Sequence, residues 1–203
     1  MRNDKTNYTI SAANFVGLRF EIKRRLLYVA IGAAIFLGAY SAGAAVPLSD
    51  EEAEEISKQF AGQIEGIDQY GIFLNNFKIS LAMFIPAAGL GFGGFAGFGT
   101  GAVFAALAAQ TPELSNIPPL AILITPFGIM EVFAYGLAMS RSGLLIVRLS
   151  KDKPWREGAW RPFYENSLVP TLIEIGIVAV VLFAAALIEW EIIQLLGGLE
   201  MIT

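Results

Sequence analysis

The sequence of 203 residues contains no cysteine and no histidine. Without them the chain can form no disulfide, thiolate nucleophile or imidazole base, and it lacks the usual ligands of zinc, haem and copper. Charged residues are also scarce, at 16% against about 25% in soluble proteins. We therefore predict no metal site, no cofactor and no catalytic residues, and a protein that is not an enzyme.

Apolar residues are abundant instead, at 55% of the chain, and the mean hydropathy is +0.59. A soluble fold of this size could not bury that much apolar surface. The composition predicts an all-α, polytopic transmembrane helical bundle. The basic residues stand beside apolar runs, where membrane topology explains them, so nucleic acid is not an expected partner.

The apolar runs predict about five membrane spans, since a helix needs about 20 residues to cross a core of about 30 Å. The spans are expected at residues 26–46, 73–90, 95–110, 120–147 and 168–190. Spans two and three come from dividing a glycine-rich stretch by a tight turn near residues 91–94. One long span plus a re-entrant segment is the alternative.

Charge along the chain predicts the orientation of these spans. Basic residues favour the cytoplasmic side, and they gather in the N-terminal segment 1–25 and in the linker 148–167. We expect both segments in the cytoplasm, the protein in the cell membrane, and the tail 197–203 outside. The linker also carries Trp155 and Trp160, which suits a position at the lipid headgroups.

Residues 49–67 predict a helix on the outer side of the membrane. Ser49 is a good N-cap, and Glu52 three residues later completes a capping box. Acidic residues crowd the first turn, where the helix dipole favours them. An apolar stripe recurs every four residues and should pack on the outer ends of the spans, with docking of a partner as the alternative. It consists of Ile56, Phe60 and Ile64.

Polar residues inside the predicted spans are costly and therefore need partners. The cluster comprises Asn75, Asn76 and Lys78 at the outer start of span two, Glu131 near the middle of span four, and Glu174 in span five. Arg141 lies nearer the inner end of span four. We expect Asn76 and Glu131 to be close together, with Lys78 compensating the carboxylate. Such a cluster either holds helices together or forms an ion or proton site.

Proline and glycine mark two further features of the spans. Pro126 and Gly128 precede Glu131 and predict a break or kink in the helix there. Small residues at intervals of four predict a close helix–helix contact. They are Gly89, Gly93, Gly97 and Gly101.

The order of these features resembles the stage II sporulation protein M family, also called DUF95. The matching residues are the 72–76 segment that opens span two, the glycine-rich stretch after it, the 125–131 segment with Ala134, and residues 138–143. The family has Pro-His-Gly-x-x-Glu in the second segment, and here Phe127 replaces the histidine. The resemblance covers residues 24–197 approximately and implies a scaffold that works with envelope proteins.

The leading functional hypothesis is thus a non-enzymatic membrane scaffold or complex subunit. A permease with an ion or proton site at Glu131 is the alternative. A membrane hydrolase is disfavoured, because no nucleophile accompanies the carboxylates. The expected partners are membrane lipids, other membrane or envelope proteins and a second copy of the chain.

Overall fold

The computed structural model describes residues 12–111, 116–156, 158 and 160–195. This part of the chain is helical and contains no strand, which confirms the all-α prediction. The predicted tail 197–203 lies outside the described residues. The helices are α1 (Ala12–Ala44), α2 (Asp50–Ile64), α3 (Gln69–Met83), α4 (Ala88–Gln110), η1 (Pro119–Ile124), α6 (Pro126–Asp152), α7 (Trp160–Phe163), η2 (Tyr164–Leu168) and α8 (Val169–Leu195).

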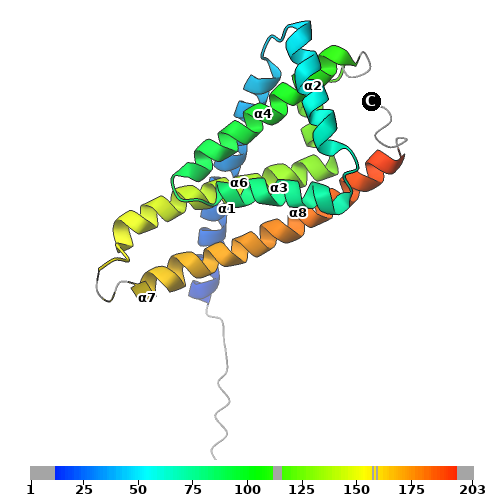
Figure 1. The fold of residues 1–203 in the computed structure, drawn as a ribbon. Coiled ribbons are helices and arrows are strands. Elements are labelled where there is room, and N and C mark those ends of the chain that lie inside the picture. The colour runs from blue at the N-terminus through cyan, green and yellow to red at the C-terminus, as the bar shows by residue number, and fades with distance from the viewer. Residues whose placement is uncertain (1–11, 112–115, 157, 159, 196–203) are drawn as a thin grey trace, which may run out of the picture.

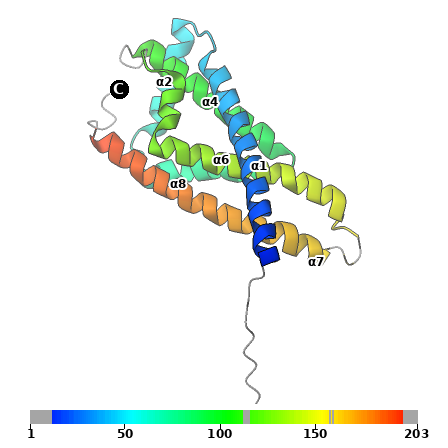
Figure 2. The same ribbon diagram turned by 180° about the vertical axis from the view of Figure 1, so that it is seen from behind.

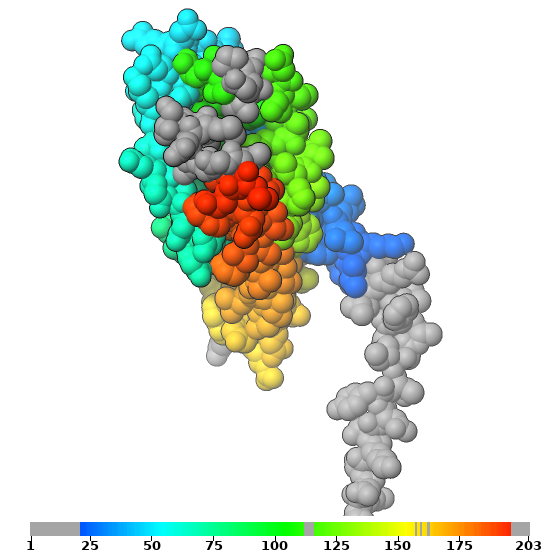
Figure 3. Space-filling model, turned by 90° about the vertical axis from the view of Figure 1, so that its right-hand side faces the viewer, coloured from blue at the N-terminus to red at the C-terminus, as the bar shows by residue number. Residues whose placement is uncertain are grey.

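Four helices in the described part are long and apolar enough to cross a membrane. They are Glu21–Ala44, Ala88–Gln110, Pro126–Asp152 and Tyr164–Leu195. The predicted second span corresponds to α3, whose 15 residues extend about 22 Å, less than a bilayer core of about 30 Å. Large apolar side chains face outward, including Leu172 and Val180 on α8, which runs open along one side of the molecule (Figure 3). The protein is therefore a membrane protein.

The helices cross one another at large angles around a small core. In Figures 1 and 2, α6 and α8 run antiparallel and side by side, and α1 crosses them steeply, while α2 and the end of α4 lie at one extremity and α7 at the other. The core is built from α1, α3, α6 and α8, with the largest share of its buried residues on α6. Its most buried members include Phe36, Met83, Met139, Val178 and Leu182.

The turn between α3 and α4 lies at residues 84–87, so the prediction of a turn at residues 91–94 was wrong. Pro86 supplies the break, because it has no backbone N–H to continue α3. Ala87 then adopts φ 68°, and α4 begins at the next residue. The glycines at 91–94 lie within α4, where Gly93 packs against the Met139 side chain of α6 and a larger side chain would collide with it.

Glycines on α4 bring its backbone against that of α1, as their spacing predicted. A Cβ added to Gly101 would lie 2.0 Å from the carbonyl oxygen of Tyr40, and one added to Gly97 would lie 2.7 Å from that of Phe36. On α1, a Cβ added to Gly43 would lie 2.0 Å from the carbonyl oxygen of Phe98. No side chain separates the two helices at these points, so their relative position is tightly constrained.

Helix α2 has the predicted capping box. The Ser49 hydroxyl accepts a hydrogen bond from the Glu52 N–H, and the Glu52 carboxylate accepts one from the Ser49 N–H at 2.9 Å. The Ser49 N–H and hydroxyl both donate to the Glu52 carboxylate and lower the pKa of Glu52. The cap therefore stabilises α2 above the usual glutamate pKa and is lost as pH falls through the lowered value. The helix ends at Ile64, earlier than the predicted residue 67, because Gly66 takes φ 68°.

The apolar stripe of α2 packs on the bundle. Ala53 is fully buried, and Ile56, Phe60 and Ile64 are half-buried on a helix that contacts α4. The side-chain amide of Gln110, at the end of α4, donates to the carbonyl of Asp50. The opposite face of α2, which carries most of its acidic residues, is exposed.

Candidate functional site

The junction between η1 and α6 positions Glu131, which belongs to the first polar cluster. The 3₁₀ helix η1 ends at Ile124, and α6 begins at Pro126, whose missing N–H is not needed in a first turn. Thr125 is the N-cap, and its hydroxyl accepts from the Gly128 N–H at 3.2 Å. Glu131 is therefore less than two turns from the start of α6, and not near the middle of a span as predicted.

Asn76 and Glu131 are in direct contact, as expected. The Asn76 amide donates to Glu131 Oε1 at 2.6 Å, joining α3 to α6. Asn75 is exposed and donates to the side-chain oxygen of Asn76 at 3.4 Å. Lys78 is also exposed and forms no ion pair with Glu131 among the described residues. Residues two apart point to different sides of a helix, so Asn76 and Lys78 cannot both face α6.

The second carboxylate at this site is Glu189. It lies near the end of α8 and close enough to Glu131 for the two charged forms to repel each other. Its Oε2 atom is buried and has no hydrogen-bond partner among the described residues. Sequence analysis missed Glu189. The available signal was that α8 runs antiparallel to α6, which brings the end of α8 beside the start of α6.

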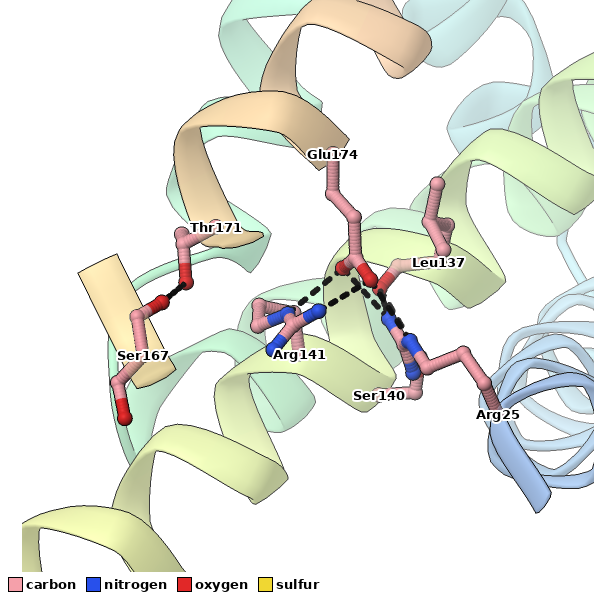
Figure 4. A network of polar contacts seen from close by, with 7 residues as sticks. All are labelled: Arg25, Leu137, Ser140, Arg141, Ser167, Thr171 and Glu174. Carbon is pink, nitrogen blue, oxygen red and sulfur yellow. Dashed lines mark hydrogen bonds and ion pairs between the residues drawn. The ribbon is translucent and has the colours of Figure 1, made fainter. Parts of the chain in front are cut away.

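Glu174 belongs to a different cluster, with two arginines, so the predicted grouping of Glu174 with Glu131 was wrong. Arg25 donates to both carboxylate oxygens, from Nε at 2.8 Å and from Nη2 at 2.7 Å. Arg141 also binds both oxygens, from Nε at 2.7 Å and from Nη2 (Figure 4). Arg25 Nη1 donates to the Ser140 hydroxyl at 2.7 Å. We call Arg25, Ser140, Arg141 and Glu174 the Glu174 cluster.

The Glu174 cluster ties three helices together. Arg25 comes from α1, Ser140 and Arg141 from α6, and Glu174 from α8. The side chain of Glu174 is only 10% exposed, and those of Arg25 and Arg141 are 20% and 12% exposed. In such surroundings a two-pronged arginine–carboxylate bond is strong and directional. Sequence analysis had assigned Arg25 to the cytoplasmic segment, and only its distant partners reveal the structural role.

A comparison with protein-family models matches residues 27–190 to stage II sporulation protein M. The chain belongs to the stage II sporulation protein M family. No curated protein and no solved structure shows significant similarity to it. The family match includes Asn76, Glu131, Glu174 and Glu189, and it begins two residues after Arg25.

One residue near Glu131 departs from the pattern to which the sequence was compared. Phe127, where the family pattern has a histidine, is half-buried in the first turn of α6. A phenyl ring can neither carry a proton nor bond to a carboxylate. The titratable groups that the structure brings together here are Glu131 and Glu189.

Proposed function

We propose that this family member is a non-enzymatic membrane scaffold, or a subunit of a larger membrane complex, which binds an envelope protein through α2. The observation that carries the proposal is the arrangement of α2, which is packed on the bundle by one face and presents acidic side chains on the other. Glu51, Glu54 and Glu55 are all exposed. A helix held rigidly by its apolar face can offer charged groups at little entropic cost.

The contacts of Glu54 and Glu55 on the acidic face contribute little to the stability of the described chain. Glu54 pairs with Lys58 at 2.5 Å, with both side chains more than half exposed, and such surface pairs contribute about 0–1 kcal/mol. Glu55 accepts only a hydrogen bond from Gln59 at 3.2 Å. A run of carboxylates that contributes little to folding is consistent with recognition of a basic partner surface.

We expect the double variant Glu51→Lys/Glu55→Lys to lose its partner during purification from native membranes. The full-length protein carries an affinity tag, and co-purifying proteins are identified and quantified. Glu191→Lys is the matched control, since it reverses an exposed carboxylate near the end of α8. Equal recovery of the same partner with both variants would contradict docking on α2.

The proposed orientation places α2 outside the cell and the N-terminus of α1 in the cytoplasm. The absence of native cysteine means that each single-cysteine variant carries one thiol. We expect an impermeant thiol reagent to label Lys58→Cys in intact cells and Ser150→Cys only after permeabilisation. Both positions are exposed. The opposite pattern would reverse the proposed orientation.

A second candidate function, a permease with a proton or ion site, is favoured by the Glu131 region. Two half-buried carboxylates within a membrane protein cannot both be charged at low cost unless a proton or cation compensates them. Glu131 is bonded only to a neutral amide, and one oxygen of Glu189 is unpaired in the described part of the chain. The preceding helix break is the kind of feature that transport sites use.

Glu131→Gln separates the two candidate functions. A structural carboxyl group should tolerate this change, because the amide oxygen can still accept from Asn76, and melting temperature and partner recovery should be preserved. Glu131→Leu should destabilise the fold by about 1–3 kcal/mol, since it leaves the Asn76 amide without an acceptor. Proton or cation flux into liposomes that disappears in Glu131→Gln would favour the permease over the scaffold.

A further inference from the structure

The Glu174 cluster has one more positive charge than negative charge. Arg25 and Arg141 share the single carboxylate of Glu174, which is the only acidic group within ion-pair distance of either in the described chain. All three nitrogens of Arg25 donate hydrogen bonds: Nε to Glu174, Nη1 to the Ser140 hydroxyl, and Nη2 to Glu174 and the Leu137 carbonyl. Arg141 donates only from Nε and Nη2, so its Nη1 has no acceptor there.

Among the residues that the structure describes, no neighbouring carboxylate supplies the missing charge. Glu21 lies one turn before Arg25 on α1, but it pairs with Arg24 at 2.5 Å. Glu165 lies two and a half turns before Glu174, and it pairs with Arg161 at 2.9 Å. Water can accept hydrogen bonds from Arg141 Nη1, but it brings no charge. An uncompensated guanidinium that is almost entirely removed from solvent therefore calls for an anion.

The depth of the cluster matches the level of lipid headgroups. Lys23 and Arg24 are exposed in the turn that precedes Arg25. Leu26 and Leu27 follow directly and are 54% and 59% exposed. The change from charged to apolar exposed residues on α1 marks the boundary of the hydrocarbon core, and Arg25 stands at that change.

We propose that the Glu174 cluster binds the phosphate of an anionic phospholipid, with Arg141 Nη1 donating to a phosphate oxygen. Arginine is suited to this role because its planar guanidinium can bind the carboxylate with one edge and a phosphate with the other. In Figure 4 the Arg141 guanidinium lies between Glu174 and the Ser167–Thr171 segment. An anionic headgroup is favoured over a zwitterionic one, because the cluster needs a net negative charge.

Two substitutions of one residue test the charge argument. Ser140 accepts from Arg25 Nη1, so Ser140→Asp adds a carboxylate beside the arginines and brings the cluster to neutrality. Ser140→Asn introduces a side chain of the same size as aspartate but adds no charge. Detergent-purified full-length protein is titrated with phosphatidylglycerol, phosphatidylcholine or inorganic phosphate, and lipid binding is followed by native mass spectrometry and melting temperature.

We expect phosphatidylglycerol to bind the parent protein more tightly than phosphatidylcholine and to raise its melting temperature. Ser140→Asn, which leaves the charge of the cluster unchanged, is the size-matched reference for Ser140→Asp. In Ser140→Asp this binding should weaken by about fivefold, the effect of one basic charge near an anionic headgroup. Arg161→Gln removes an 86% exposed cation of the α7 segment and should keep the parent affinity.

Three results would overturn the proposal. Equal binding of both lipids would remove the argument from charge. Equal stabilisation by inorganic phosphate at the same concentration would identify a soluble anion as the ligand. A loss in Arg161→Gln with no loss in Ser140→Asp would move the lipid to the surface cations. If Ser140→Asp does not fold, Arg141→Met gives the same test, because the remaining Arg25–Glu174 pair is neutral.

Discussion

Replacing Glu174 by glutamine is expected to destabilise the protein by about 3–5 kcal/mol, the usual cost of removing one partner from a buried ion cluster. The neutral amide offers one acceptor to two guanidiniums, and its own N–H groups point at their donors. The two arginines then repel each other across a gap that water reaches poorly. The measurement is thermal unfolding of detergent-solubilised protein by circular dichroism, with recovery of folded protein after size exclusion.

Glu165→Gln is the matched control for this substitution. It removes the same charge from the exposed Arg161–Glu165 pair and should change stability by less than about 1 kcal/mol. Removing the whole cluster should restore much of the loss, because apolar side chains can replace a buried ion group. Similar melting temperatures for Glu174→Gln and Glu165→Gln would show that the cluster contributes little.

Gly101→Ala is expected to disrupt the contact between α4 and α1. Its Cβ would lie 2.0 Å from the Tyr40 carbonyl oxygen and 2.7 Å from the Ala44 nitrogen. Both atoms are backbone, so the collision can be relieved only by moving α1 away from α4. We expect the free energy of unfolding to fall by about 1–3 kcal/mol or more, measured by the same unfolding assay.

Gly99→Ala provides the comparison on the same helix. Nothing lies within 4 Å of a Cβ at Gly99, and alanine stabilises a helix by up to about 1 kcal/mol relative to glycine. Gly99→Ala should therefore leave the melting temperature unchanged or raise it. A loss of stability in both variants would indicate that helix flexibility, and not contact with α1, determines the effect.

Features that depend on neighbouring residues were predictable from the sequence. Ser49 and Glu52 specify the start of α2 through bonds three residues apart. The separation of four between Gly97 and Gly101 indicated the contact with another helix. The turn between α3 and α4 was misplaced because glycine was taken as a helix breaker. The stronger signal was Pro86, which lacks the N–H that a continuing helix requires.

Features that depend on distant residues were predicted only in part. Asn76 and Glu131 were paired correctly, because a carboxylate within a span needs a partner and the amides of span two were the nearest candidates. Arg25 and Glu174 are 149 residues apart, and no local pattern connects them. The rotation of α8 decides that Glu174 faces Arg25 and Glu189 faces Glu131, and that rotation is set by packing of the whole bundle.

The separation of 149 residues between Arg25 and Glu174 also has a consequence for biogenesis. Helices enter the membrane in the order of their synthesis, and α1 leaves the ribosome long before α8. Until α8 arrives, Arg25 and Arg141 lack the carboxylate that binds them both, and two neighbouring guanidiniums repel each other. The N-terminal helices therefore cannot reach their final arrangement before the last one is inserted. Chains truncated before Glu174 should remain open to membrane quality-control proteases.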